Sequence, residues 1–198
     1  MKNFLPIALG SILCLLLTSC VTTSEYPLSS PGTAQPDLKL VGTWHEKGDN
    51  DETYEFTVKD AHWMHIENRK EDKPPESYDM FVTVIDGNRF LNVRHVGNDE
   101  QGHPFKKEFF ILRYEVTDHV LSTWMLDQDK AAAAVRSGKL KGTIHQNQSM
   151  VGNPPRPDVD VFLQDSGENM VKFIHENGPK ALLSDKADKM LRVENAKP

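Results

Sequence analysis

The stretch Met80-Phe81-Val82-Thr83-Val84-Ile85-Asp86-Gly87-Asn88-Arg89-Phe90-Leu91-Asn92-Val93-Arg94-His95-Val96 decides the fold class of this 198-residue chain. Two mostly apolar runs, 80–85 and 90–96, flank the turn residues Asp86-Gly87-Asn88. Asp-Gly between two such runs is among the strongest short signals for a β-hairpin. The sequence therefore predicts two antiparallel strands joined by a tight turn.

Strand signals continue on both sides of this hairpin. Tyr54, Phe56 and Val58 alternate with polar residues, which puts one strand face in a core and the other in water. The segments 107–117 and 120–126 each place mostly apolar residues on one face, namely Phe110, Leu112, Tyr114 and Val116, then Val120, Ser122, Trp124 and Leu126. Six or seven strands with short connections indicate an antiparallel meander.

The C-terminal half adds two helices to the strands. Asp127 is the expected N-cap of a helix over 128–137, and Ser166 that of a helix over about 167–176. Further strands are expected at 140–145, 159–163 and 190–193, with a Pro-rich loop over 147–158. The fold class is mainly β, a single closed antiparallel barrel of about eight or nine strands, because closure removes exposed strand edges.

Gly42-Thr43-Trp44 on the first strand resembles the Gly-x-Trp signature of the lipocalin-like barrels. The resemblance implies that Trp44 plugs one end of the barrel and that Arg192 packs across its ring, a cation–π contact worth about 0.5–2 kcal/mol. The order of elements is also similar to that of uncharacterised bacterial lipoproteins with a lipocalin-like domain, including the Phe90-Leu91 strand and the late helices. The second Thr-Asp-Tyr-type signature of true lipocalins is missing.

The N-terminus has the features of a targeting segment. Phe4 to Leu17 is an apolar run of 14 residues after the single positive charge of Lys2. A spanning helix needs about 20 apolar residues, so the run is typical of a signal peptide. Leu17-Thr18-Ser19-Cys20 resembles the bacterial lipobox, which implies cleavage before Cys20 and a diacylglycerol on its thiol. The membrane is then a partner through the N-terminal lipid only.

We therefore expect three parts: a lipoprotein signal peptide over 1–19, a lipidated Cys and flexible linker over 20–37, and a lipocalin-like barrel domain over 38–198. Nine of the 17 residues from Val21 to Asp37 are Ser, Thr or Pro, a composition typical of a linker. A flexible coil of that length spans about 20–25 Å. Val21 is not Asp, the residue that resembles an inner-membrane retention signal, so the expected location is the periplasmic face of the outer membrane in a two-membrane bacterium.

Charge and cysteine content exclude several classes of function. The formal net charge is −6, and it becomes −7 once Lys2 is removed with residues 1–19. An acidic domain argues against nucleic acid as a partner. Cys20 is the only cysteine beyond Cys14, so the domain has no disulfide and no thiolate nucleophile or metal ligand.

No constellation of residues predicts catalysis, a metal or a cofactor. His62 and His65 are three apart and point to opposite faces of a strand, so they cannot share a metal. His119 and Ser122 face oppositely too, without the strand–elbow–helix context of a nucleophile. The acidic loops 48–52 and 98–101 lack calcium-loop spacing. An enzyme would be indicated only if two or more of a set of histidines met in one cleft, namely His62, His65, His95, His119 and His145.

Two hypotheses for function remain. The first is a binding module for a small apolar or amphipathic ligand inside the barrel, lined by Trp44, Tyr54, Phe56, Phe110, Tyr114 and Trp124. The second is a structural or accessory envelope protein with a filled barrel that acts through its surface. A cavity of roughly 300 Å³ or more would favour the first, and a solid core the second.

Overall fold

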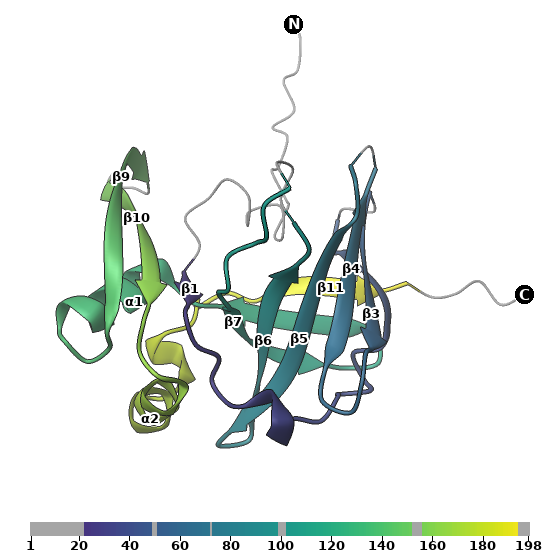
Figure 1. The fold of residues 1–198 in the computed structure, drawn as a ribbon, viewed down its shortest axis with the longest axis horizontal. Helices are drawn as coiled ribbons and strands as arrows, with labels where there is room; N and C mark the ends of the chain where they lie inside the picture. Colours follow the sequence, from purple (N-terminus) through teal and green to yellow (C-terminus); the bar gives the residue numbers. More distant parts are fainter. Residues whose placement is uncertain (1–21, 49–50, 72, 99–101, 152–155, 194–198) are drawn as a thin grey trace, which may run out of the picture.

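The computed structural model describes residues 22–48, 51–71, 73–98, 102–151 and 156–193. The signal peptide and lipobox predicted within residues 1–20 lie outside these ranges. The described chain forms the predicted mainly β fold with a closed antiparallel barrel (Figure 1). Eight strands make the barrel: β2 (Gly42–Glu46), β3 (Glu52–Val58), β4 (Met64–Lys70), β5 (Glu76–Ile85), β6 (Asn88–Val96), β7 (Phe110–Val116), β8 (Val120–Met125) and β11 (Asp188–Arg192).

The predicted hairpin is the β5–β6 pair. Ile85 pairs with Asn88, so that only Asp86 and Gly87 form the turn. Both turn residues have positive φ, 49° and 77°, as the type I′ turn favoured in two-residue hairpins requires. The prediction from Asp86-Gly87 is confirmed, and this pair of long strands forms the front wall of the barrel in Figure 1.

The last strand closes the barrel. In β11, Met190 pairs with Glu46 of β2 and with Leu121 of β8, antiparallel on both sides. Seven strands of the meander are sequential, and β11 joins their two free edges. The edges that would otherwise invite pairing with other chains are thereby satisfied within the barrel.

Two helices follow the caps predicted for them. In α1 (Gln128–Arg136) the carboxylate of Asp127 accepts the N–H groups of Asp129 and Lys130. In α2 (Gly167–Asn177) the hydroxyl of Ser166 accepts the N–H of Asn169. These bonds satisfy N–H groups that a helix start leaves without an intrahelical partner. Short 3₁₀ turns occupy η2 (Pro31–Thr33) and η3 (Pro179–Ala181).

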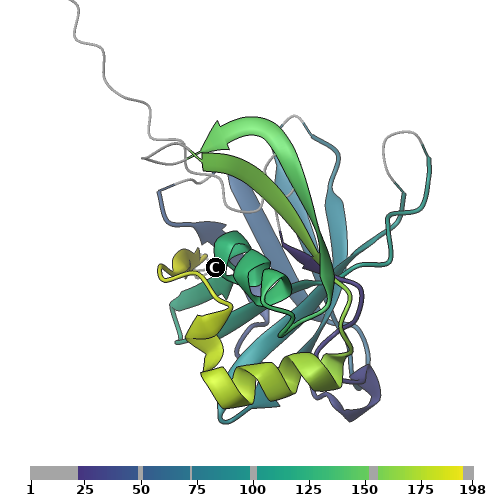
Figure 2. The ribbon, with the colours of Figure 1, turned by 90° about the vertical axis from the view of Figure 1, so that its left-hand side faces the viewer.

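A second sheet lies beside the barrel and covers one side of it together with α1 and α2 (Figure 2). Its order is β1 (Thr23–Ser24), β10 (Arg156–Leu163) and β9 (Gly142–Val151). The strands expected at 140–145 and 159–163 therefore stand outside the barrel. The expected loop over 147–158 is wrong in part, because β9 extends to Val151 and β10 begins at Arg156.

Two separate cores result from this arrangement. One core fills the barrel and contains Trp44, Tyr54, Phe56 and their neighbours. The other lies between the outer wall of the barrel and the second layer. It collects outward residues of the barrel strands, the small side chains of α1, the inner face of β10 and the apolar face of α2: Phe90, Ile111, Ala131, Ala132, Val161, Leu163, Met170 and Phe173 among others.

The prediction of a flexible linker over 20–37 is wrong for the described residues 22–37. Thr22, Ser24, Leu28 and Ala34 are buried, between 0% and 5% exposed. The segment runs along the outside of the barrel, where the side chain of Asn92 on β6 accepts the N–H of Leu28 at 2.7 Å. A few apolar anchors and backbone bonds therefore fix a segment whose composition is typical of a linker.

Candidate ligand site in the barrel

One end of the barrel is closed by Trp44. Its ring is 0% exposed, and its Nε1 donates to the carbonyl of Leu40 at 2.8 Å. The guanidinium carbon of Arg192 lies 4.2 Å from the ring centroid, so the contact that the resemblance implied is present. Arg192 also donates to the carbonyls of Lys39, Val41 and Asp118 at 2.6–2.7 Å.

A glycine at position 42 allows Arg192 to pack against Trp44. Its φ is +131°, a conformation that residues with a Cβ rarely adopt. A Cβ at this position would lie 2.5 Å from Nη1 of Arg192. Gly42, Trp44 and Arg192, the three residues expected to close the barrel, therefore meet at one end.

The opposite end carries polar side chains on the inward face of the strands. At the closed end, Gly42 pairs with Phe56 of β3. The inward residues of β3 run from Phe56 through Tyr54 to Glu52, so Glu52 lies toward the opposite end of the barrel. We call this polar end the rim and define it by Glu46, Glu52, Asn68, Lys70, Glu76, His95 and Asp188.

Between the closed end and the rim lies a cavity of about 70 Å³. Its walls are mostly apolar, and two rim carboxylates contribute to them: Glu46, Tyr54, Phe56, Ile66, Tyr78, Leu91, Val93, Phe110, Leu112, Leu121, Thr123, Met125, Asp188 and Met190. Drug-sized ligands occupy about 300–1,000 Å³. The cavity has room for about two to five water-sized groups, so only a short apolar group can be enclosed.

Glu52 is the most connected carboxylate of the rim. Its Oε1 accepts from Tyr54 Oη at 2.6 Å and from Asn68 Nδ2 at 2.8 Å, and its Oε2 accepts from Lys70 Nζ at 3.1 Å. Burial raises the pKa of Glu52, but the three donors outweigh burial and hold that pKa below its usual value. Burial and Glu52 both raise the pKa of Tyr54. Glu52 is therefore an anion at neutral pH and holds Tyr54 protonated.

An aromatic stack covers the other side of the rim. The ring of His95 lies between Tyr78 and Phe105, with centroids 4.1 Å from each. Nε2 of His95 lies 3.7 Å from Oε2 of Glu76, which also accepts from Tyr78 Oη at 2.6 Å. The contacts with His95 and Tyr78 hold the pKa of Glu76 below its usual value.

Asp188 differs from the other rim carboxylates. It starts β11 and lines the cavity, and burial raises its pKa above the usual value. No cation or hydrogen-bond donor contacts its carboxylate within the described residues. A polar group of a ligand at the rim would meet this carboxylate next to apolar walls.

Five of the six aromatic residues expected to line a cavity belong to the barrel core, but only Tyr54, Phe56 and Phe110 line the cavity itself. Trp124 does not face the interior, because Leu121, Thr123 and Met125 are the residues of β8 that line the cavity. Trp124 instead packs against the outer core, and the guanidinium carbon of Arg113 lies 4.5 Å from its ring centroid. Both faces of β8 carry apolar residues, so the period of two did not reveal which face is inside.

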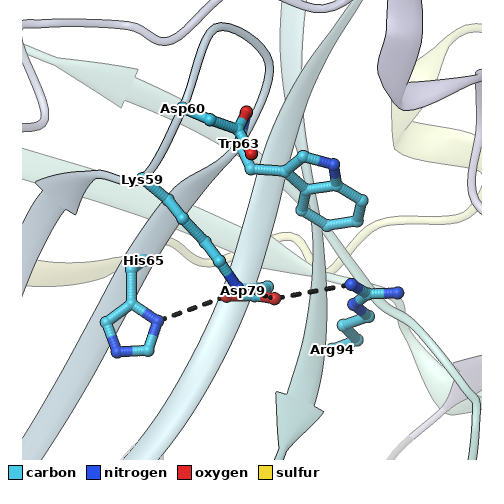
Figure 3. Close-up of polar contacts among 6 residues, drawn as sticks. All are labelled: Lys59, Asp60, Trp63, His65, Asp79 and Arg94. Carbon is cyan, nitrogen blue, oxygen red and sulfur yellow. Dashed lines mark hydrogen bonds and ion pairs between the residues drawn. The ribbon is translucent and has the colours of Figure 1, made fainter.

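The outer wall of the barrel carries a second cluster of polar contacts, centred on Asp79 of β5 (Figure 3). Asp79 is 2% exposed, and three basic groups surround its carboxylate: Lys59 Nζ at 2.7 Å, His65 Nδ1 at 3.2 Å and Arg94 Nη2 at 3.4 Å. Burial raises the pKa of Asp79, but these groups outweigh burial and hold that pKa below its usual value.

Trp63 completes this outer cluster. The guanidinium carbon of Arg94 lies 4.3 Å from the Trp63 ring centroid, and Phe81 meets the ring edge-on at 5.0 Å. The carboxylate of Asp60 accepts the N–H groups of His62 and Trp63, which fixes the turn between β3 and β4. The cluster joins β4, β5, β6 and the turn between β3 and β4 around one buried charge, and its chemistry is that of a structural ion network.

The candidate catalytic and metal residues are distributed over different faces. Nδ1 of His62 contacts the carbonyl of Ala34, whereas His65 contacts Asp79 on the outer wall and His95 belongs to the rim. Ser122 lies within β8, which continues as a strand to Met125, so no nucleophile elbow surrounds it. Within the described ranges, no group of three or more His, Cys, Asp or Glu side chains is placed to hold a metal ion.

No protein-family model, curated protein or solved structure matches this chain. Among the described residues, none of the helices has the length and apolar character needed to span a membrane.

Proposed function

We propose that this protein is a lipid-anchored lipoprotein of the bacterial cell envelope whose barrel binds a small amphipathic ligand at the rim. The apolar cavity of about 70 Å³ beneath a polar rim is the observation that carries the binding role. The lipobox-like Leu17-Thr18-Ser19-Cys20 after an apolar run supports the anchor, and Cys20 is the residue that takes the lipid. Val21 favours the outer membrane over the inner.

The size of the cavity restricts the ligand. An acyl chain of a typical membrane lipid does not fit into about 70 Å³, but a short alkyl group does. The remainder of the ligand would sit among the rim side chains, where hydrogen-bond donors and carboxylates are both present. The ligand class is therefore a molecule with a short apolar end and a polar head.

A homologous series tests the binding role. Titration with unbranched alcohols from ethanol to octanol should show affinity rising about fourfold per methylene, until the cavity is filled. Val93→Leu narrows the cavity and should shorten the chain at which affinity stops rising. Val84→Leu, the same change at a position 62% exposed, serves as the control. Affinity that does not depend on chain length would contradict binding in the cavity.

The anchor is tested separately. Cys20→Ser should abolish incorporation of labelled palmitate, whereas Cys14→Ser, inside the segment expected to be removed, should leave it unchanged. Equal labelling of the Cys20 variant and the parent protein would rule out acylation at Cys20.

An accessory protein that acts through its surface is the second candidate. The observation that favours it is the small cavity, well below the roughly 300 Å³ expected for a ligand carrier. Failure of every member of the alcohol series to bind, in a protein that still takes up palmitate, would favour this second function.

A further inference from the structure

The fixed body of the protein begins two residues after Cys20. Thr22 is 3% exposed and Ser24 is 0% exposed, and β1 pairs with β10 through Thr23 and Ser24. Consecutive Cα atoms are about 3.8 Å apart, so the Cα atoms of Cys20 and Thr22 are separated by no more than about 7–8 Å. A lipid on Cys20 would therefore lie within about one headgroup layer of the folded surface, far closer than the linker of about 20–25 Å expected from composition.

The direction of β1 shows on which side of the molecule the described chain begins. β1 runs parallel to β10, so Thr22 lies on the side of Thr23 that faces the start of β10 at Arg156. The start of β10 and the start of β5 lie on the same upper side in Figure 1. Thr22, the described residue nearest to Cys20 in the chain, and the end of the rim at the start of β5 are thus on one side of the molecule.

Direct contacts join β1 to the connection that borders the rim. Thr23 Oγ1 donates to Glu108 Oε2 at 2.9 Å, and Ser24 exchanges two backbone hydrogen bonds with Phe109 at 2.9 and 2.7 Å. The described part of this connection before β7, residues 102–108, also carries Phe105, which stacks on His95 of the rim. The same short segment therefore touches both the attachment strand and the rim.

The chemistry of residues 102–108 suits a phospholipid surface. His103, Lys106 and Lys107 are exposed, and Phe105 is half-buried beside them. Lys106 and Lys107 can contact the phosphates that all phospholipid headgroups share, whereas the rim carboxylates disfavour a strongly anionic surface.

We propose that the acylated Cys20 holds the barrel with residues 102–108 and the adjoining rim against a phospholipid bilayer, so that the ligand enters the barrel from the lipid side. This orientation rests on the lipid anchor proposed above. It replaces the flexible linker of about 20–25 Å that composition predicted with a tether of two residues.

Quenching of single labels on the anchored protein tests the orientation. After lipidation at Cys20 the chain has no free thiol, so His103→Cys and Val84→Cys each place one label, beside the rim and on an exposed strand position near the β5–β6 turn. The lipidated full chain is placed in vesicles of phosphatidylethanolamine and phosphatidylglycerol that contain a headgroup spin label. Quenching at residue 103 should exceed quenching at residue 84 at least threefold.

A longer tether provides the matched control. Insertion of ten Gly/Ser residues between Val21 and Thr22 adds about 15–20 Å of flexible chain and should bring the quenching ratio close to one. Equal quenching at both positions of the parent protein, with the protein still floating with the vesicles, would overturn the orientation alone. Loss of flotation would overturn the anchor and the orientation together. A ratio that stays high in the extended variant would overturn the short tether as its cause.

Discussion

Arg192 and Trp44 are directly paired across β11 and β2, and the guanidinium carbon of Arg192 lies 4.2 Å from the centroid of the Trp44 ring. Residues from the first and last strands of the barrel therefore close it at the same point. Because the ring is fully buried and Arg192 also holds three backbone carbonyls, this pair joins the two chain ends of the barrel more firmly than strand pairing alone.

Trp44→Ala should lower the free energy of unfolding by about 3–5 kcal/mol, because it removes a fully buried ring and leaves a cavity at the closed end. Urea denaturation followed by circular dichroism measures the loss. Trp63→Ala, a partly exposed tryptophan on the outer wall, is the comparison and should cost less. A loss below about 1 kcal/mol for the Trp44 variant would show that the ring does not seal the barrel.

Asn92→Ala should detach the segment 22–37 from the barrel wall. The variant loses the acceptor for Leu28 N–H and the donor to Phe81 and Thr83, all buried, at a cost of about 1–3 kcal/mol. Limited proteolysis should then cut within residues 22–37 faster than in the parent protein. Asn98→Ala, at an exposed position, should leave both stability and cleavage unchanged; equal protection in the two variants would contradict the role of Asn92.

Asp79→Asn should destabilise the protein at neutral pH and not in acid. The pKa of Asp79 is lowered in the folded state, so its contribution is present above the unfolded pKa of about 3.9 and is lost as pH falls through the lower folded pKa. Urea denaturation should give a deficit of about 1–3 kcal/mol at pH 7 that shrinks as the pH falls below about 3.9. Asp185→Asn, whose carboxylate is 79% exposed beside Lys130, should show little deficit at either pH.

Asp188→Asn should stabilise the protein at neutral pH, the opposite of the effect of Asp79→Asn. Burial raises the pKa of Asp188, so the carboxylate disfavours folding at pH values above its folded pKa and has no such effect below about 3.9. At pH 7 the variant should melt at a slightly higher temperature than the parent protein. The corresponding gain in the free energy of unfolding should be less than about 1 kcal/mol, because the group is partly exposed. The two melting temperatures should converge at pH 3; a lower melting temperature at pH 7 would show that the charge is stabilised in the fold.

Period-two alternation and turn chemistry predicted most of the barrel. The Asp86-Gly87 turn, the inward face of β7 and both helix caps follow from local sequence. Trp124 was misplaced because apolar residues occupy both faces of β8, and only the closed sheet decides which face is inside. The second sheet was missed as a separate layer, since strand signals in β9 and β10 do not indicate their partners.

The rim was missed although its signal is present in the sequence. Glu52 shares a strand face with Tyr54 and Phe56, so the same alternation that buries the rings also turns this carboxylate inward. Charged residues in strands are usually exposed, so the inward position of Glu52 was not predicted. The fixed position of residues 22–37 could not be read from composition, because the partners that anchor the segment, such as Asn92 and Glu108, lie far along the chain.

The parallel pairing of β1 with β10 also determines how the protein bears mechanical load. If the lipid proposed for Cys20 pulls along the axis of β1, tension reaches the hydrogen bonds between Ser24 and Phe109 and between Glu25 and Leu163. These bonds lie across the strand, so a pull along it loads them together in shear rather than opening them one at a time. Phe109 precedes a barrel strand and Leu163 ends the second sheet, so the load is shared between both layers of the fold at the residues nearest the anchor.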